Sequence, residues 1–180
     1  MGMAAPHFVT PDMARALPDD GNHYETVHGE LLVTPAPSFR HQNIVLALAR
    51  ALDDYCRLIS VGNVVTPTAE VSLTPDSLVQ PDVFVVPPVR DPDPAWADLG
   101  RPLLIVEILS PSTAPTDRFT KRLHYQRARI PAYWIVDGEE REVAVWAPEA
   151  LEPVIEREML TWQPIPSVPP LRLPVKQLFR

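Results

Sequence analysis

The sequence lacks features that mark several protein classes. It has a single cysteine, Cys56, among 180 residues, so an intramolecular disulfide is excluded and a reducing compartment is expected. No apolar run is long enough to span a bilayer, and residues 1–21 lack the charged-then-apolar pattern of a secretory signal peptide. We therefore expect a cytoplasmic protein without a membrane partner.

Positive charge is also scarce. The chain has 16 Lys and Arg against 23 Asp and Glu, which gives a formal net charge of −7. It therefore lacks the overall basic character that is typical of nucleic-acid-binding proteins. A polyanion such as DNA would need either a local basic patch or a bound metal ion to offset this charge.

The composition that is present is that of an ordinary globular protein. Hydrophobic residues make up 46% and charged residues 22%, and the length suits one domain with its own core. We therefore expect a single domain over residues 1–180. The 23 prolines are densest at residues 87–102 and 162–174, which predicts irregular connections because proline lacks the backbone N–H that helices and ladders use.

Hydrophobic periodicity predicts alternating helices and strands. Helices are expected at residues 10–18, 38–60 and 116–129. Strands are expected at residues 24–27, 30–34, 64–73, 83–86, 103–109, 132–137 and 141–148. The first two strands form an N-terminal β-hairpin, and the strand at 64–73 is interrupted by Pro67. This order predicts an α/β (α+β) domain with a mixed sheet flanked by helices.

Two of the predicted helices carry an apolar face. In the helix at 38–60, with Ser38 as its N-cap, the inward set is Ile44, Leu48, Ala51, Leu52, Tyr55 and Leu58. In the helix at 116–129 the predicted inward residues are Phe119, Leu123 and Gln126, and Lys121 borders this set.

Two acids stand where buried strands are predicted. Asp82 opens the strand at 83–86, and Glu107 lies inside the strand at 103–109. An ionised carboxylate in a buried strand is costly unless it is paired or binds a metal. If the two strands are neighbours, the acids converge, and a divalent cation would remove their repulsion and supply a Lewis acid. Lys121, on the following helix, is the candidate cation that orients the attacking water and offsets developing charge.

Each of these residues also has a structural interpretation. Asp82 could simply start a strand after Pro81. Glu107 could form a buried ion pair with an arginine. Lys121 could lie on the surface in a helical pair with Asp117. The combination of the three favours a metal site over these alternatives.

The same segments carry a family resemblance. "PDVFVV", "LLIVEILSPST", "TDRFTKRLHYQRARI" and "PAYWIVD" resemble the Uma-two (Uma2) family of predicted endonucleases in the PD-(D/E)XK, or restriction-endonuclease-like, superfamily. "GNHYETVHGELLVTPAPSFRHQNIVLALARAL" is similar to the hairpin of this family and the helix that follows it, which begins with a histidine. The resemblance covers residues 10–179 and implies a restriction-endonuclease-like fold with a metal site at one end of the sheet.

The resemblance implies roles for particular residues. Asp82 and Glu107 match the two metal-binding acids, and Glu25 matches a further acid that helps to hold the metal. Lys121 matches the catalytic cation, because Leu109 stands where the wider superfamily has a lysine. Glu30 and His41 are weaker candidates from the same region. The implied cofactor is Mg²⁺, with Mn²⁺ as a substitute, and the implied substrate is DNA.

The sequence departs from the family pattern at three positions. Thr26 replaces an apolar residue, Arg129 stands where glycine is usual, and Ala132 stands where glutamate is usual. Glycine at position 129 would end the helix in a left-handed turn, so Arg129 must end it in another way or let it continue. Any role that the family gives to an acid at position 132 is therefore in doubt, although Asp82 and Glu107 are both present.

Three functions remain open at this point. The first is a Mg²⁺-dependent endonuclease, the second is a catalytically inactive nucleic-acid- or protein-binding module on the same fold, and the third is a structural protein. Basic residues on one helix could form a phosphate track or could be solvated charges: Arg118, Lys121, Arg122, Arg127 and Arg129. Trp96, Trp146 and Trp162 either seal a homodimer interface or cover the domain's own core.

Overall fold

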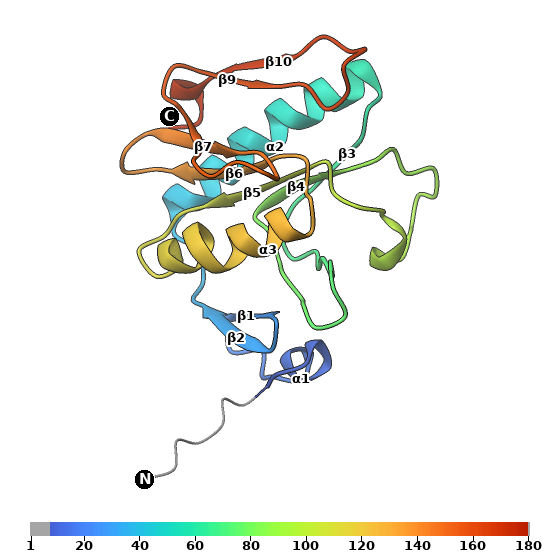
Figure 1. The fold of residues 1–180 in the computed structure, drawn as a ribbon, viewed down its shortest axis with the longest axis vertical. Helices are drawn as coiled ribbons and strands as arrows, with labels where there is room; N and C mark the ends of the chain where they lie inside the picture. The colour runs from blue at the N-terminus through green and yellow to red at the C-terminus, as the bar shows by residue number, and fades with distance from the viewer. Residues whose placement is uncertain (1–7, 180) are drawn as a thin grey trace.

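The computed structural model describes residues 8–179, and its centre is a six-stranded mixed sheet (Figure 1). The strands are β3 (Asn63–Val65), β4 (Val83–Val86), β5 (Leu104–Ile108), β6 (Tyr133–Asp137), β7 (Glu142–Trp146) and β8 (Val154–Glu156), in that spatial order. All neighbours are antiparallel except β5 and β6, which are parallel. A parallel pair needs a crossover, and a helical segment supplies it.

That crossover helix lies on one face of the sheet. A π-helical segment, η2 (Thr116–Lys121), continues directly into α3 (Arg122–Arg127), and we call the two together the η2–α3 helix. The long helix α2 (Phe39–Ile59) covers the opposite face (Figure 1). This arrangement of a mixed sheet between helices confirms the predicted fold class.

Strand alternation divides the sheet residues between two cores. On the α2 side lie Val83, Val85, Leu104, Val106, Ile108, Trp134 and Val136, with Ile44, Leu48 and Leu52 from the helix. On the η2–α3 side lie Phe84, Val86, Ile105, Tyr133 and Ile135, with Tyr125 and Ile130. Because successive side chains of a strand point to opposite faces, Glu107 shares the face of Ile105 and points toward the η2–α3 helix.

Helix α2 begins and ends with defined caps. The hydroxyl of Ser38 accepts a hydrogen bond from the backbone N–H of His41, as expected of an N-cap, and Ser60 ends the helix in the left-handed conformation. The predicted inward face is confirmed at Ile44, Leu48 and Leu52. It is wrong at Leu58, which is 81% exposed, whereas its neighbour Ile59 packs against the core.

The N-terminal hairpin forms a separate two-stranded sheet. It consists of β1 (His23–Val27) and β2 (Glu30–Thr34), joined by a turn in which His28 and Gly29 both have positive φ. The short helix α1 (Pro11–Arg15) precedes it, with Thr10 as its N-cap as predicted. An isolated bridge between Thr26 and Leu78 joins the hairpin to the rest of the chain.

A second small sheet, near the C-terminus, was not predicted. It consists of β9 (Met159–Trp162) and β10 (Leu171–Pro174) and is followed by η3 (Val175–Gln177). The proline-rich stretch at 162–174 is therefore only partly irregular. Leu160, Trp162 and Leu173 pack into the α2 core, so this sheet lies alongside α2 (Figure 1).

The structure also bears on the strand predicted at 64–73 and on the three tryptophans. Of the strand predicted at 64–73, only the start belongs to the sheet, and Val71 makes an isolated bridge to Val79, because Pro67 cannot continue the ladder. Trp162 packs on Trp134 with ring centroids 6.2 Å apart, so it belongs to the domain's own core. Trp96 is exposed and Trp146 is half-buried, and the homodimer stays a prediction.

The η2–α3 helix ends at the position where the resemblance implies a glycine. Arg129 has φ of 54°, so an arginine adopts the left-handed conformation that glycine usually supplies. The backbone N–H of Ile130 then returns to the carbonyl of Tyr125 at 3.0 Å. Helix termination is thus preserved despite the substitution. Among residues 8–179, no helix has the length and apolar character needed to cross a membrane.

Candidate functional site

The buried face of the η2–α3 helix is polar. Asp117, Lys121, His124 and Tyr125 are buried at helical spacing, whereas Phe119 is 62% and Leu123 is 41% exposed. The predicted inward set of Phe119 and Leu123 is therefore wrong. Apolarity selected the wrong face because the sheet presents carboxylates to this part of the helix, and polar partners outweigh burial of the apolar residues.

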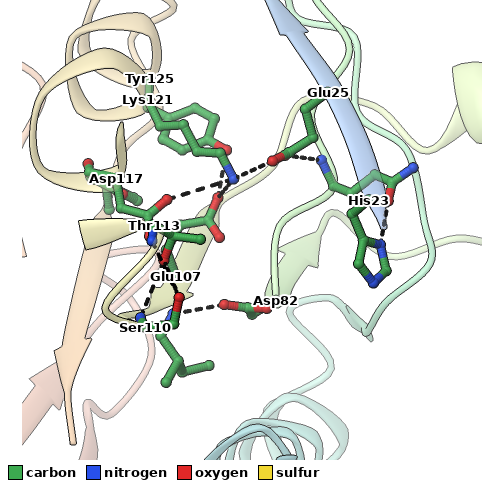
Figure 2. Close-up of polar contacts among 12 residues, drawn as sticks. His23, Glu25, Asp82, Glu107, Ser110, Thr113, Asp117, Lys121 and Tyr125 are labelled. Atoms are coloured by element: carbon green, nitrogen blue, oxygen red, sulfur yellow. Dashed lines mark hydrogen bonds and ion pairs between the residues drawn. The ribbon is translucent and has the colours of Figure 1, made fainter. Parts of the chain in front are cut away.

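Lys121 lies at the centre of this face. It is 4% exposed, and its Nζ atom is 2.8 Å from Oε2 of Glu25 and 3.1 Å from Oε1 of Glu107. Oδ1 of Asp117, one turn earlier on the helix, is 3.6 Å away. Figure 2 shows the amine between the acids from β1 and β5. The interpretation of Lys121 as a surface residue is wrong.

Glu107 has a lysine, not an arginine, as its cationic partner. Besides Lys121, the hydroxyl of Tyr125 donates to the same Oε1 atom at 2.9 Å. Both donors come from the η2–α3 helix, on the face that strand alternation assigns to Glu107. The alternative of an arginine pair is not realised in the described part of the chain. For Oε2 of Glu107 the structure gives no hydrogen bond within residues 8–179.

Glu25 reaches the site from the hairpin. Its Oε1 atom accepts a hydrogen bond from the backbone N–H of Gln80 at 2.7 Å, and its Oε2 atom pairs with Lys121. Both oxygens are therefore engaged, so Glu25 fixes Lys121 in this arrangement. Its predicted role as a metal ligand stays a prediction that requires one of these contacts to open.

Asp82 lies beside Glu107 at the end of the neighbouring strand. Its Oδ2 atom accepts from the backbone N–H of Ile108 at 2.7 Å and is 3.1 Å from Nε2 of His41. Ile108 follows Glu107 directly, so this hydrogen bond places the two acids at one position along the sheet. Glu30, in contrast, is exposed and does not line the site.

One cavity joins these residues. It has a volume of about 850 Å³ and is lined, among others, by Glu25, His41, Asp82, Glu107, Asp117 and Lys121. The structure therefore brings all four predicted site residues to a single cavity. Asp117 is the acid that the sequence reasoning left out of the site, although its spacing of four residues from Lys121 was a signal.

The cluster holds more negative than positive charge. Burial alone would lower the pKa of Lys121, but the charges of Glu107, Glu25 and Asp117 outweigh it and raise that pKa well above its usual value. Burial, reinforced by the neighbouring acids, raises the pKa of Glu107 well above its usual range despite Lys121. Burial likewise raises the pKa of Asp117 to about 6. One ammonium therefore does not compensate the acids around it.

The donor set fits a divalent cation. Oε2 of Glu107 and Oδ1 of Asp82 have no hydrogen bond within the described residues, and both side chains line the cavity. Two carboxylates completed by waters are a set that Mg²⁺ accepts, and added positive charge would relieve the excess of acids. Across residues 8–179, the His, Cys, Asp and Glu side chains form no ready-made group of three or more metal ligands.

The expected basic track is largely occupied by contacts within the chain. Arg118 pairs with Asp137 at 2.8 Å, and Arg129 pairs with Glu149 at 3.1 Å. The guanidinium of Arg122 lies 4.6 Å from the ring centroid of Trp146. These contacts favour solvated or locally paired helix charges over a continuous phosphate track.

Comparisons with known proteins show the family of the chain. A family model described as "Putative restriction endonuclease" matches residues 11–176. The chain belongs to the Uma2 family. The predicted family resemblance is therefore confirmed.

A solved structure matches the fold of this Uma2 chain. It is the crystal structure of "a putative nuclease belonging to DUF820" from Anabaena variabilis ATCC 29413. The TM-score is 0.74 with 22% identity, and the match covers 95% of this chain and 97% of the other. At this identity the likeness shows a shared fold. No curated protein matches the chain.

Proposed function

We propose that this Uma2 chain is a Mg²⁺-dependent endonuclease that hydrolyses DNA phosphodiester bonds. The observation that carries the proposal is the cavity in which two carboxylates with free oxygens, Asp82 and Glu107, lie beside a buried lysine. The family description supports nuclease chemistry. Phosphoryl transfer needs charge stabilisation and positioning more than it needs a covalent protein intermediate.

Asp82 and Glu107 would hold the metal, with Mn²⁺ as a substitute for Mg²⁺. A bound divalent cation supplies Lewis-acid stabilisation of the charge on a phosphate. Glu25 would join as a ligand only after it leaves Lys121 or the backbone of Gln80. The excess of buried acids makes the site attractive to a divalent cation whichever of these arrangements is used.

Lys121 would act as a fixed cation. Because the surrounding acids raise its pKa, it stays protonated and does not remove a proton from water. It would instead donate hydrogen bonds to the attacking water or to a phosphate oxygen and offset charge that develops there. Glu25 and Asp117 hold the ammonium in place for this role.

DNA would meet a surface that is not uniformly basic. Arg40 and Arg118 line the same cavity, but they pair with Glu139 and Asp137. Phosphates would have to compete with these acids, so we expect binding to weaken steeply with salt and to strengthen with divalent cations.

Plasmid nicking tests the proposal. Supercoiled plasmid incubated with the chain and Mg²⁺ or Mn²⁺ should be nicked, and Glu107→Ala and Lys121→Ala should abolish nicking. Asp82→Ala should remove divalent-metal binding in calorimetry. Glu30→Ala is the matched control, because Glu30 is exposed and outside the cavity. Nicking that survives Glu107→Ala would contradict the proposal.

A second candidate is a nucleic-acid- or protein-binding module without turnover. The observation that favours it is that Lys121 already pairs with Glu25 and Glu107, so the cluster is partly neutralised by the chain itself. This candidate predicts DNA or partner binding that Glu107→Ala leaves intact, with no nicking by the unsubstituted chain under any divalent cation.

A further inference from the structure

His41 contacts Asp82 from the first turn of α2. Its Nε2 atom is 3.1 Å from Oδ2 of Asp82, and its side chain is only 10% exposed. The start of the helix does not require this side chain, because the Ser38 cap uses the backbone N–H of His41. The imidazole therefore needs an explanation separate from helix formation.

The chemistry of the contact fixes the direction of the hydrogen bond. A carboxylate oxygen only accepts, so Nε2 of His41 carries the hydrogen and donates to Asp82. The other ring nitrogen, Nδ1, is buried and has no hydrogen-bond partner in the described part of the chain. A buried polar atom without a partner is destabilising, so an apolar side chain would serve packing alone at least as well.

One oxygen of Asp82, Oδ2, accepts two hydrogen bonds. Oδ2 receives the N–H of Ile108 from β5 and the Nε2–H of His41 from α2. Because the two donors come from different elements, they fix the rotation of the carboxylate about the Cβ–Cγ bond. Within residues 8–179, Oδ1 is thereby left without a hydrogen-bond partner, on a residue that lines the cavity beside Glu107.

We propose that His41 is a positioning residue, which holds the carboxylate of Asp82 so that Oδ1 is presented to a divalent cation shared with Glu107. The inference rests on the proposed function, since it concerns the same cation. A ligand whose second oxygen is held by a hydrogen bond loses less freedom when it binds a metal, and such supporting partners change metal affinity by about 10- to 100-fold.

Two polar variants of His41 test the inference. His41→Gln keeps an N–H near the place of Nε2, whereas the shorter His41→Asn does not reach Asp82. With Mn²⁺ alone as the probe, calorimetry should show affinity about 10- to 100-fold weaker in His41→Asn and within about threefold of the unsubstituted chain in His41→Gln. Melting curves recorded without metal would check that both variants are folded.

A second readout needs no metal. The amide N–H of Ile108 shares Oδ2 of Asp82 with His41, so its NMR shift and hydrogen exchange report how that carboxylate is held. We expect faster exchange of this amide in His41→Asn and near-native exchange in His41→Gln. The amide of Val136, in the neighbouring strand β6, is the control and should be unchanged in both variants.

The outcomes separate the two proposals. Equal Mn²⁺ affinity in the unsubstituted chain and in His41→Asn would overturn the positioning role and leave the metal site standing. Equal loss in His41→Asn and His41→Gln would overturn it as well, because the donor would then not be what matters. Absence of Mn²⁺ binding to the unsubstituted chain would overturn both the metal site and the inference.

Discussion

The two ends of the buried face of the η2–α3 helix hold polar groups in different ways. At Lys121, three carboxylates surround one ammonium at 2.8, 3.1 and 3.6 Å. At His124, three residues further along, both ring nitrogens are buried and have no hydrogen-bond partner among residues 8–179. The ring instead packs edge-on against His28, with centroids 5.1 Å apart.

The difference follows from charge. Lys121 stays ionised because acids from β1, β5 and its own helix offset the desolvation penalty of its ammonium. His124 stays neutral, because burial, together with the neighbouring charge of His28, lowers its pKa to about 4. Buried ions with partners mark the end of the helix that lines the cavity, while the neutral imidazole serves to dock the hairpin turn.

Removal of the ammonium should give the largest effect. Lys121→Met leaves Glu25, Glu107 and Asp117 buried around an apolar side chain, so we expect a loss of about 3–5 kcal/mol in the free energy of unfolding. Urea denaturation measures it. Addition of Glu107→Gln to the same chain should recover part of the loss, since one uncompensated charge is gone.

Phe119→Ser is the control for this prediction, because Phe119 is exposed on the opposite side of the same helix. It should change stability by less than about 0.5 kcal/mol. A loss below about 1 kcal/mol in Lys121→Met would mean that the three acids do not depend on the ammonium, and the contrast between the two ends would disappear.

The buried neutral His124 should make the stability of the fold depend on pH. The folded-state pKa of His124, about 4, lies below its ordinary value of 6.5, so between these values the unfolded chain binds more protons. The contribution of the neutral imidazole to the free energy of unfolding is fully present above pH 6.5. It is lost progressively as pH falls toward 4, by at most about 3 kcal/mol. His124→Leu should remove this dependence from denaturation curves recorded across that range.

The test compares the free energy of unfolding of the unsubstituted chain with that of His124→Leu at each pH. Asp117, whose pKa is raised to about 6, contributes with the opposite sign and is present in both chains, so it cancels. The other groups near the ring, His28, Asp76 and Arg127, are also unchanged. If the two chains lose stability in parallel from pH 6.5 to 4, the imidazole is not held neutral by burial.

The smallest effect is expected for the loss of a single hydrogen bond to Glu107. Tyr125→Phe removes the hydroxyl that donates to Glu107 and leaves Lys121 in place, so it should cost about 1–2 kcal/mol. Tyr55→Phe is the matched control, since its hydroxyl donates to the backbone carbonyl of Pro169 far from the cavity. A larger cost in Tyr55→Phe would show that the cluster adds nothing to the strength of this hydrogen bond.

The sequence allowed much of the fold to be predicted, and part of the site. The strands at β4 and β5 were readable because both faces of a central strand are buried, which leaves an unbroken apolar run. Asp82 and Glu107 stood out against these runs. The hairpin and α2 followed from turn and cap residues such as Gly29 and Ser38.

Other features could not be predicted from the pattern of apolar residues. The helix of Lys121 buries a face whose members are an acid, a lysine, a histidine and a tyrosine, so its two apolar residues pointed to the wrong side. Strands β9 and β10 were missed because a two-stranded sheet beside prolines has no strong periodic signal. The role of His41 depends on a contact over 41 residues of sequence, which spacing does not reveal.

By itself, the amino-acid order determined which segments become helices and strands and which acids interrupt buried strands, because propensity and periodicity act over a few neighbouring residues. Only the tertiary structure decided that Lys121 lies between Glu25 and Glu107, and that Asp82 shares one oxygen between His41 and Ile108. These arrangements join residues from separate elements, and their energies depend on burial and distance, which exist only once the chain has folded.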